Sequence, residues 1–395
     1  MNNMIKKSDV LSSSMKLWNW IKRENYSGYD PYDGLSGKMS LFSDKKLLNL
    51  LLLQMNLYSP VNLRPMLGIK KGRSNKCLAL LARANLILYE VTKRSEFRNE
   101  AELLLDNLIN ANLSKTQGEF SCSSYYFKYV APRHLLDPTV PDIVCLTESI
   151  KSFIKAFQTL KNELYLEKAE EALGFLTSNL LAADNGVYHF KYTPRERGKI
   201  VINVSALALE AISRYLDVVY RKDLYELGVN VAKLILKYQR KDGAWPYSVY
   251  SGGHLYWQID YHQGFIIDGL ASFKKYYDAF EIKYAINNGV EFYKKLFIDG
   301  CKSYYRYPIK YPIDIHNQAQ GIITFSKLFL ENYSASYIDM SKEIAHWTIK
   351  NMQNPIGYFY HQRWPLFVNT IPYIRWGQAW MLLALSVLLK AICKN

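Results

Sequence analysis

Two short Asp-x-His units follow one another in the second half of this 395-residue chain. Asp260 and His262 stand in IDYHQGF, and Asp314 and His316 stand in PIDIHNQAQ. A carboxylate beside a histidine can fix the imidazole tautomer and raise its pKa, which suits a general acid or base. The alternative is that each Asp only caps a helix while each His bonds a neighbouring loop. Two Asp and two His without recognisable ligand spacing predict no metal, and we expect no cofactor.

Two further carboxylates, Asp30 and Asp33, lie in YDPYDG, and Arg64 follows in NLRP. Paired carboxylates suit glycoside hydrolysis, in which one protonates the leaving group and the other acts as base or nucleophile. Asp-Pro and Asp-Gly are equally ordinary turn residues. Arg64 could hold a substrate carboxylate or phosphate with two hydrogen bonds, or it could pair with Asp33. Both interpretations stay open at this point.

Aromatic residues concentrate in KDGAWPYSVYSGGHLYWQIDYHQGF, residues 241–265. Flat aromatic faces pack against the C–H groups of sugars, while tyrosine hydroxyls can reach sugar hydroxyls. Trp245 also fits a structural role, as a plug at the corner between two repeats. The candidate substrate contacts, together with Arg64, are Trp245, Tyr247, Tyr256, Trp257, Tyr261, Tyr305, His361, Trp364 and Arg375.

The overall composition favours a folded protein with an anionic partner. Hydrophobic residues make up 49% of the chain and the net charge is +15. Such a charge suits an acidic polysaccharide, a lipid-linked sugar or a membrane face, and glycosyltransferases are further candidate partners. No dense Arg/Lys run or nucleic-acid motif occurs, so we expect no nucleic acid. Five scattered Cys without C-x-x-C indicate a reducing compartment. With no apolar leader at the start, the expected location is cytoplasmic.

A repeat organises the elements that must position these residues. Gly186, Gly243, Gly300 and Gly357 are each 57 residues apart. Each unit contains a Gly-bearing loop, a strongly apolar helical pattern, a polar break and an amphipathic helix. Fully apolar helices are buried on all sides and amphipathic ones keep a wet face. The expected inner helices are 75–93, 143–160, 203–219, 260–278, 317–332 and 375–392, and the expected outer helices are 97–112, 164–180, 223–240, 283–297 and 337–352.

The helix count predicts a closed ring. Six inner helices have only five outer partners, and the amphipathic segment 6–24 has none. We therefore predict an all-α (α/α)6 toroid, residues 1–395 as one domain, closed by the N-terminal helix packing on the C-terminal one. An open solenoid would leave 375–392 as an uncapped apolar end. All inner helices of such a ring begin at one end, which we call the mouth. Segment 26–74 should form an excursion over this mouth, with an extra helix at 43–57. The Gly-bearing loops should line that mouth, where function usually resides.

The 57-residue period and the string DGAW resemble the α/α-toroid superfamilies. These include six-hairpin glycosidases, uronate lyases, sugar epimerases and the terpene cyclases, and Gln239, Asp242, Gly243 and Trp245 are similar to one QW motif of the cyclases. The chain also resembles bacterial proteins of capsule and exopolysaccharide biosynthesis loci, in YSGYDPYDGL (26–35), NLRPMLGIKKGRSNKCLAL (62–80) and YPIDIHNQAQ (311–320). That resemblance implies a role in surface polysaccharide biology.

Missing motifs narrow the chemistry further. The sequence contains no G-x-S-x-G, no Walker A loop, and no D-x-D-D acid motif of terpene cyclases. We expect a carbohydrate-active enzyme: a glycoside hydrolase, or a uronate lyase or epimerase. The last two share proton abstraction at C5, in which Arg64 would neutralise the sugar carboxylate. The alternatives are a non-catalytic glycan-binding or scaffold protein and, third, a terpenoid cyclase.

Overall fold

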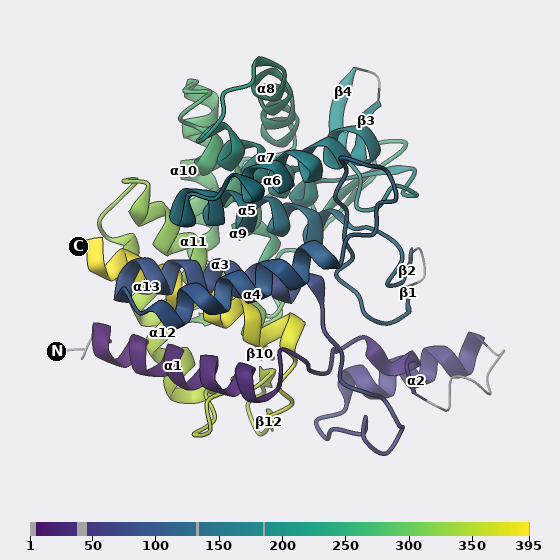
Figure 1. Cartoon of the computed structure of the whole chain (residues 1–395), viewed down its shortest axis with the longest axis vertical. Coiled ribbons are helices and arrows are strands. Elements are labelled where there is room, and N and C mark those ends of the chain that lie inside the picture. The colour runs from purple at the N-terminus through teal and green to yellow at the C-terminus, as the bar shows by residue number, and fades with distance from the viewer. Residues whose placement is uncertain (1–4, 38–45, 132–133, 185, 395) are drawn as a thin grey trace.

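The computed structural model describes residues 5–37, 46–131, 134–184 and 186–394. Helices that are buried on nearly every face form an inner ring within this part of the chain (Figure 1). Each inner helix packs against the next one, and the last packs against both its predecessor and the first. The inner helices are α3 (Asn75–Thr92), α5 (Ile143–Leu160), α7 (Ile202–Leu216), α9 (His262–Phe273), α11 (Ile315–Leu330) and α13 (Ala379–Lys394), the last preceded by the π-helical turn η4 (Ile374–Gln378).

Amphipathic helices cover the outside of this ring. In α8 the buried residues Leu224, Gly228, Val231 and Ile235 recur every three or four positions, so one face packs inward and the other stays in water. Each outer helix packs on an inner one. The outer helices are α1 (Lys7–Arg23), α4 (Ser95–Asn110), α6 (Glu163–Phe175, extended by η3, Leu176–Leu180), α8 (Lys222–Lys237), α10 (Phe280–Lys294) and α12 (Tyr337–Met352).

The N-terminal helix closes the ring, as the sequence predicted. Helix α1 packs along α13, and both termini lie at the same side of the molecule (Figure 1). Trp18 of α1 donates its indole N–H to the amide oxygen of Asn85 over 2.8 Å, and its ring lies 5.2 Å from that of Phe97. The fold is therefore an (α/α)6 toroid whose first helix covers its last.

The repeated glycines mark a tight corner before each inner helix. Gly186, Gly243, Gly300 and Gly357 all have φ between 74° and 122°, a region that disfavours residues with a Cβ. At Gly243 an added Cβ would also lie 2.2 Å from the backbone oxygen of Asn288 in the next outer helix. The 57-residue period therefore reflects a backbone conformation that recurs in each unit, and at Gly243 and Gly357 also a close approach to backbone of an outer helix.

Glutamines of the inner helices hold the loops that follow these corners. The side-chain oxygen of Gln263 accepts the backbone N–H of Trp245 and its amide donates to the Trp245 carbonyl, both over 2.9 Å. Gln378 makes the same pair of bonds to Phe359, over 2.8 and 2.7 Å. Each pair of hydrogen bonds fixes the position at which a mouth loop enters the ring. It therefore also fixes the first turn of the inner helix that follows.

Short antiparallel strands tie neighbouring mouth loops together. One sheet joins β5 (Lys199–Val201), β6 (Ser248–Tyr250) and β7 (Leu255–Tyr256), and another joins β10 (Ile313–Asp314), β11 (Gln362–Arg363) and β12 (Val368–Asn369). Each sheet therefore bridges two consecutive repeat units. The remaining strands pair locally: β1 (Tyr129–Ala131) with β2 (His134–Leu136), β3 (Leu181–Asp184) with β4 (Val187–Phe190), and β8 (Phe297–Ile298) with β9 (Lys302–Ser303).

The N-terminal excursion contains the turn η1 (Asp33–Leu35) and the extra helix α2 (Lys46–Tyr58), which projects away from the ring (Figure 1). Residues 38–45, which include the first part of the predicted helix 43–57, lie outside the described residues. The apolar stretch Ile374–Lys394 is long enough to cross a membrane, but 78% of its most apolar window is buried inside the ring. That burial is the packing of a core helix.

Candidate active site

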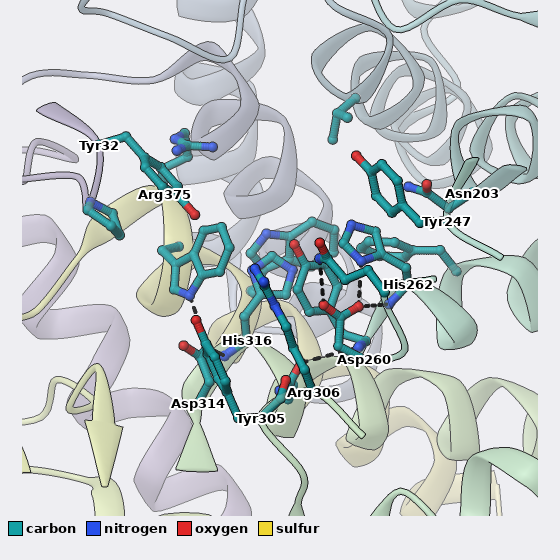
Figure 2. Close-up of a pocket in the computed structure, with 18 of the residues that line it drawn as sticks. Tyr32, Asn203, Tyr247, Asp260, His262, Tyr305, Arg306, Asp314, His316 and Arg375 are labelled. Atoms are coloured by element: carbon teal, nitrogen blue, oxygen red, sulfur yellow. Dashed lines mark hydrogen bonds and ion pairs between the residues drawn. The ribbon is translucent and has the colours of Figure 1, made fainter. Parts of the chain in front are cut away.

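The first turns of the inner helices surround one cavity of about 310 Å³ (Figure 2). The cavity opens among the mouth loops, and Pro31, Tyr32 and Leu57 of the N-terminal excursion contribute to its wall. Each inner helix, or the turn that precedes it, contributes a residue from its first turn to the cavity wall. These residues are Lys76 of α3, Val144 of α5, Asn203 of α7, His262 of α9, His316 of α11 and Trp376 of η4.

Asp260 and His262 form a hydrogen-bonded pair in the cavity wall (Figure 2). An Asp260 carboxylate oxygen lies 2.5 Å from Nδ1 of the imidazole and also accepts the His262 backbone N–H over 3.1 Å. Gln258 donates to the other carboxylate oxygen over 2.8 Å. Burial alone would raise the pKa of Asp260, but His262 and these bonds outweigh it and hold that pKa below its usual range. Asp260 is therefore an ionised orienting group, and Nε2 of His262 is left for a substrate.

His316 lines the same cavity in a different state. It is buried, and neither ring nitrogen has a hydrogen-bond partner among the described residues. Burial, with the positive charge of Lys76 nearby, holds the pKa of His316 well below its usual range. The ring lies 4.9 Å from that of Trp376 and 5.0 Å from that of Trp380. His316 is therefore a neutral imidazole with two polar atoms that the fold leaves unsatisfied.

Tyr261 separates the two histidines. Its ring stacks on His262 at 4.1 Å and on His316 at 4.2 Å between centroids, with 28° between the planes in each case. The Tyr261 backbone N–H donates to the Asn317 side chain over 3.2 Å, which fixes the loop to the next inner helix. The two Asp-x-His units, 54 residues apart in sequence, thus meet in one stack, as expected from their places in adjacent repeats.

Asp314 is more heavily bonded than Asp260. One oxygen accepts the His316 backbone N–H over 2.9 Å and the Trp376 indole N–H over 2.9 Å. The other accepts from Gln362 over 2.8 Å and lies 3.5 Å from Nε2 of His361. Asp314 caps α11 and ties the last two mouth loops together. The capping alternative thus holds for Asp314, whereas Tyr261 occupies the N-cap position of α9 and Asp260, one residue earlier, accepts the His262 N–H. Both histidines still line the cavity.

The carboxylates of the YDPYD stretch do not line the cavity. Asp30 and Asp33 are fully buried. Asp30 receives two hydrogen bonds from Arg375, over 2.5 and 2.8 Å, and Asp33 pairs with Arg64 at 2.6 Å. The Asp30–Arg375 pair attaches the N-terminal excursion to the turn η4 before the last inner helix, and the Asp33–Arg64 pair holds the excursion together. The geometry contradicts catalytic roles for Asp30 and Asp33 and a substrate role for Arg64, because the fold already uses all three charges internally.

The predicted substrate contacts divide into two groups. Trp245 is fully buried, donates its indole N–H to the Ile235 carbonyl over 3.0 Å and plugs the repeat corner, so a substrate contact is contradicted there. Tyr256 and Trp257 are exposed beside the cavity and do not line it, and Trp364 stacks on Phe367 instead. The residues that do line the cavity are Tyr247, Tyr261, Tyr305, His361 and Arg375.

Sequence reasoning missed several wall residues, among them Lys76, Asn203, Arg306, Trp376 and Trp380. A signal was present for some of them. Lys76 and Asn203 are polar residues in the first turn of otherwise apolar inner helices, and that position is the one that His262 and His316 also occupy. A polar residue at the start of a helix that is otherwise buried therefore marks this cavity.

Comparison with known proteins supports the fold. No protein-family model matches the chain, and no curated protein matches it. An unsaturated glucuronyl hydrolase from Bacillus sp. GL1 is similar with a TM-score of 0.65 at 12% identity, over 96% of each chain. A cellobiose 2-epimerase from Bacillus thermoamylovorans gives 0.63 at 11%, over 82% of this chain and 88% of that one. An α-mannanase from Bacteroides thetaiotaomicron gives 0.64 at 11%, over 82% and 88%. At these identities the likeness shows the (α/α)6 toroid.

Proposed function

We propose that the protein is a carbohydrate-active enzyme that moves a proton on a sugar, with His262 as the base. The observation that carries this proposal is the Asp260–His262 pair, which shares one cavity with the neutral His316. Because Asp260 holds Nδ1, the other nitrogen of His262 can take a proton while the carboxylate stabilises the resulting imidazolium.

His316 supplies the complementary function. A buried imidazole that stays neutral can donate a hydrogen bond to a carbonyl oxygen and to the enediolate that develops there. A base paired with such a donor suits proton abstraction from a carbon next to a carbonyl group. Epimerisation and isomerisation of sugars use this step, and β-elimination of a uronate begins with the corresponding step at C5. We place the reaction in this group.

Glycoside hydrolysis has less support from the same geometry. It needs a carboxylic acid that is protonated at working pH, in addition to a second carboxylate. Asp260 has its pKa held low, and the oxygens of Asp314 already face the donors Trp376, Gln362 and the His316 backbone. Among the described cavity residues, these two are the carboxylates. Neither resembles the acid that a glycosidase requires.

Several observations support a sugar as the substrate. Rings of Tyr247, Tyr305 and Trp376 line the cavity, as expected for packing against sugar faces. The glucuronyl hydrolase, the epimerase and the mannanase that share the fold are carbohydrate enzymes by name. The net charge of +15 supports an anionic glycan. A place in surface polysaccharide biosynthesis, on lipid-linked glycans and in the cytoplasm, stays part of this proposal.

A non-catalytic glycan-binding protein is the second candidate. It is favoured by one observation: Asp260 and Asp314 both accept the backbone N–H of the histidine that follows, which is a capping role. Such a protein would use the same cavity and the same rings. It would not need His262 to change its protonation state.

Solvent exchange separates these functions. The protein is incubated in D₂O with glucose, mannose, cellobiose and glucuronic acid, and carbon-bound deuterium is followed by NMR and mass spectrometry. Proton transfer predicts deuterium next to the carbonyl or at C5, lost in His262→Gln. New reducing ends without carbon-bound deuterium would point to hydrolysis. Saturation-transfer signals from a bound sugar, without either product, would support the binding protein and overturn the proposal.

A further inference from the structure

Among the described residues, four Lys or Arg side chains line the cavity, and two of them have a carboxylate partner. Arg375 makes two hydrogen bonds to Asp30, and Lys199 lies 3.2 Å from a Glu196 carboxylate oxygen. Arg306 is exposed, so water solvates its charge. The fourth, Lys76, is buried in the first turn of α3, with 4% of its surface exposed. Lys76 is therefore the cation whose placement needs an explanation.

No carboxylate within the described part of the chain forms an ion pair with Lys76. Its ammonium has no carboxylate oxygen within 4 Å, and its nearest aromatic partner, the Trp380 ring, lies 5.7 Å away. The neighbouring anions are occupied. Asp142 accepts from the backbone N–H groups of Ser124 and Cys145, and Asp30 is bound to Arg375. Burial, reinforced by the charge of Arg375, lowers the pKa of Lys76 to about 8.

An unpaired buried charge is costly, and proteins usually keep one only where a ligand completes it. Trp380, the ring nearest to Lys76, lies 5.0 Å from His316. Lys76 therefore lies in the part of the cavity wall that carries His316. A substrate group that reaches it would lie next to the reacting part of the sugar.

We propose that Lys76 binds a carboxylate or phosphate group of the substrate, so that the cavity selects sugars that carry an oxyanion. This inference rests on the proposed function and adds its substrate class. An oxyanion beside the ammonium would restore the charge balance of the buried site through charge-assisted hydrogen bonds. It would also leave Arg375 free to keep its structural bond to Asp30.

Binding measurements test the inference separately from turnover. Glucuronic acid, glucose 6-phosphate and glucose are titrated calorimetrically into the His262→Gln protein, which cannot transfer the proton, and into the same protein with Lys76→Met. We expect one of the two anionic sugars to bind at least about tenfold more tightly than glucose. The sugar that does so identifies the source of the oxyanion. Lys76→Met should abolish this preference and leave the glucose affinity unchanged.

A matched control and a stability readout complete the test. Lys199→Met also removes a cavity lysine, but one that already has Glu196 beside it, so the anion preference should survive. Without ligand, Lys76→Met should raise the melting temperature by about 1–4 °C, because it removes a buried uncompensated charge. A merely structural lysine would lower the melting temperature when replaced.

The outcomes distinguish this inference from the proposed function. If neutral glucose binds as tightly as both anionic sugars, or if Lys76→Met keeps the preference, the inference is wrong even where deuterium exchange proceeds. If the Lys76-dependent preference is found but no sugar exchanges its carbon-bound proton, the anion site stands and the proton-transfer proposal fails. Trapping of a sugar on Lys76 by cyanoborohydride would overturn the inference by showing a covalent amine role.

Discussion

The repeat units that carry Asp260–His262 and Asp314–His316 share a local sequence and differ in what surrounds it. In both units the Asp side chain accepts the backbone N–H of the His, over 3.1 and 2.9 Å. In the first unit the same carboxylate also bonds its own imidazole. In the second it bonds Trp376 and Gln362 instead, and the imidazole is left without a partner. One local motif thus gives a hydrogen-bonded Asp–His pair in one unit and a buried, neutral histidine in the other.

The difference shows which level of structure assigns each role. The backbone cap is local, because it needs only an Asp two residues before the donor. Whether the carboxylate also bonds its own imidazole depends on tertiary contacts. In the second unit the competing donors come from other elements, Trp376 from the turn η4 and Gln362 from the last mouth loop. In the second unit the Asp carboxylate bonds that loop and not its own imidazole. In the first unit, among the described residues, one carboxylate oxygen bonds the imidazole and Gln258 donates to the other.

The largest expected effect is on catalysis through the first unit. His262→Gln should lower the rate of carbon–deuterium exchange by about 10²–10⁴-fold, the range that a general base contributes. His316→Gln should lower it less, because a glutamine amide can still donate a hydrogen bond to an oxyanion. Both variants should keep the circular dichroism spectrum of the native protein. Equal losses in the two variants would contradict the division of roles between the units.

The repeat corners offer a second way to compare the two units. Gly243 and Gly300 both have positive φ, 97° and 74°. An added Cβ at Gly243 would lie 2.2 Å from the Asn288 backbone oxygen, whereas at Gly300 its nearest neighbour is the flexible Glu343 side chain at 3.3 Å. We expect Gly300→Ala to lower the free energy of unfolding by about 1 kcal/mol and Gly243→Ala by about 3 kcal/mol or more. Urea denaturation measures both free energies of unfolding. Equal losses would show that the backbone strain at positive φ, and not the contact with Asn288, determines the cost.

These glycines also explain how far the sequence could predict the fold. A 57-residue spacing and apolar helices were visible without coordinates, and α5 (Ile143–Leu160) and α12 (Tyr337–Met352) begin and end where the pattern placed them. Closure followed from counting, since 6–24 had no partner within its own unit. Local periodicity records burial directly, so it predicts which helices are inner and which are outer.

The site was less predictable because its chemistry depends on long-range pairing. Asp30 and Asp260 were both candidate catalytic carboxylates, yet Asp30 forms an ion pair with Arg375, 345 residues away. Nothing in YDPYD records that ion pair. Lys76 was overlooked for the opposite reason, because a lone lysine is ordinary until its helix proves to be buried around it. Residue type and spacing predict candidates, and tertiary contacts decide which of them remain available.

The two aspartates should separate stability from activity. Asp314→Asn places an amide where Trp376, Gln362 and the His316 N–H all donate, so at least one donor loses its acceptor. We expect the free energy of unfolding to fall by about 2 kcal/mol. Asp260 also accepts three hydrogen bonds, but one of them holds Nδ1 of His262, so Asp260→Asn should slow exchange more than Asp314→Asn does. The reverse order would reassign the catalytic carboxylate to the second unit.

The last prediction is a pH dependence of stability that belongs to the second unit. His361 lies beside Asp314, and its burial outweighs that carboxylate and lowers the pKa of His361 to about 4. An unfolded histidine binds its proton near pH 6.5. Between these values the unfolded state therefore holds more protons than the folded one. The free energy of unfolding should fall as the pH falls from about 6.5 to about 4, by at most about 1.4 kcal/mol per pH unit for each such histidine. His316, whose pKa is also low through burial, adds to the slope in the same direction.

His361→Gln should flatten the slope by about one proton, measured by urea denaturation across this range. His346→Gln, at an exposed position on α12, is the matched control and should leave the slope unchanged. An unchanged slope in His361→Gln would mean that His361 binds its proton in the folded state as readily as in the unfolded one, and burial would then not lower its pKa.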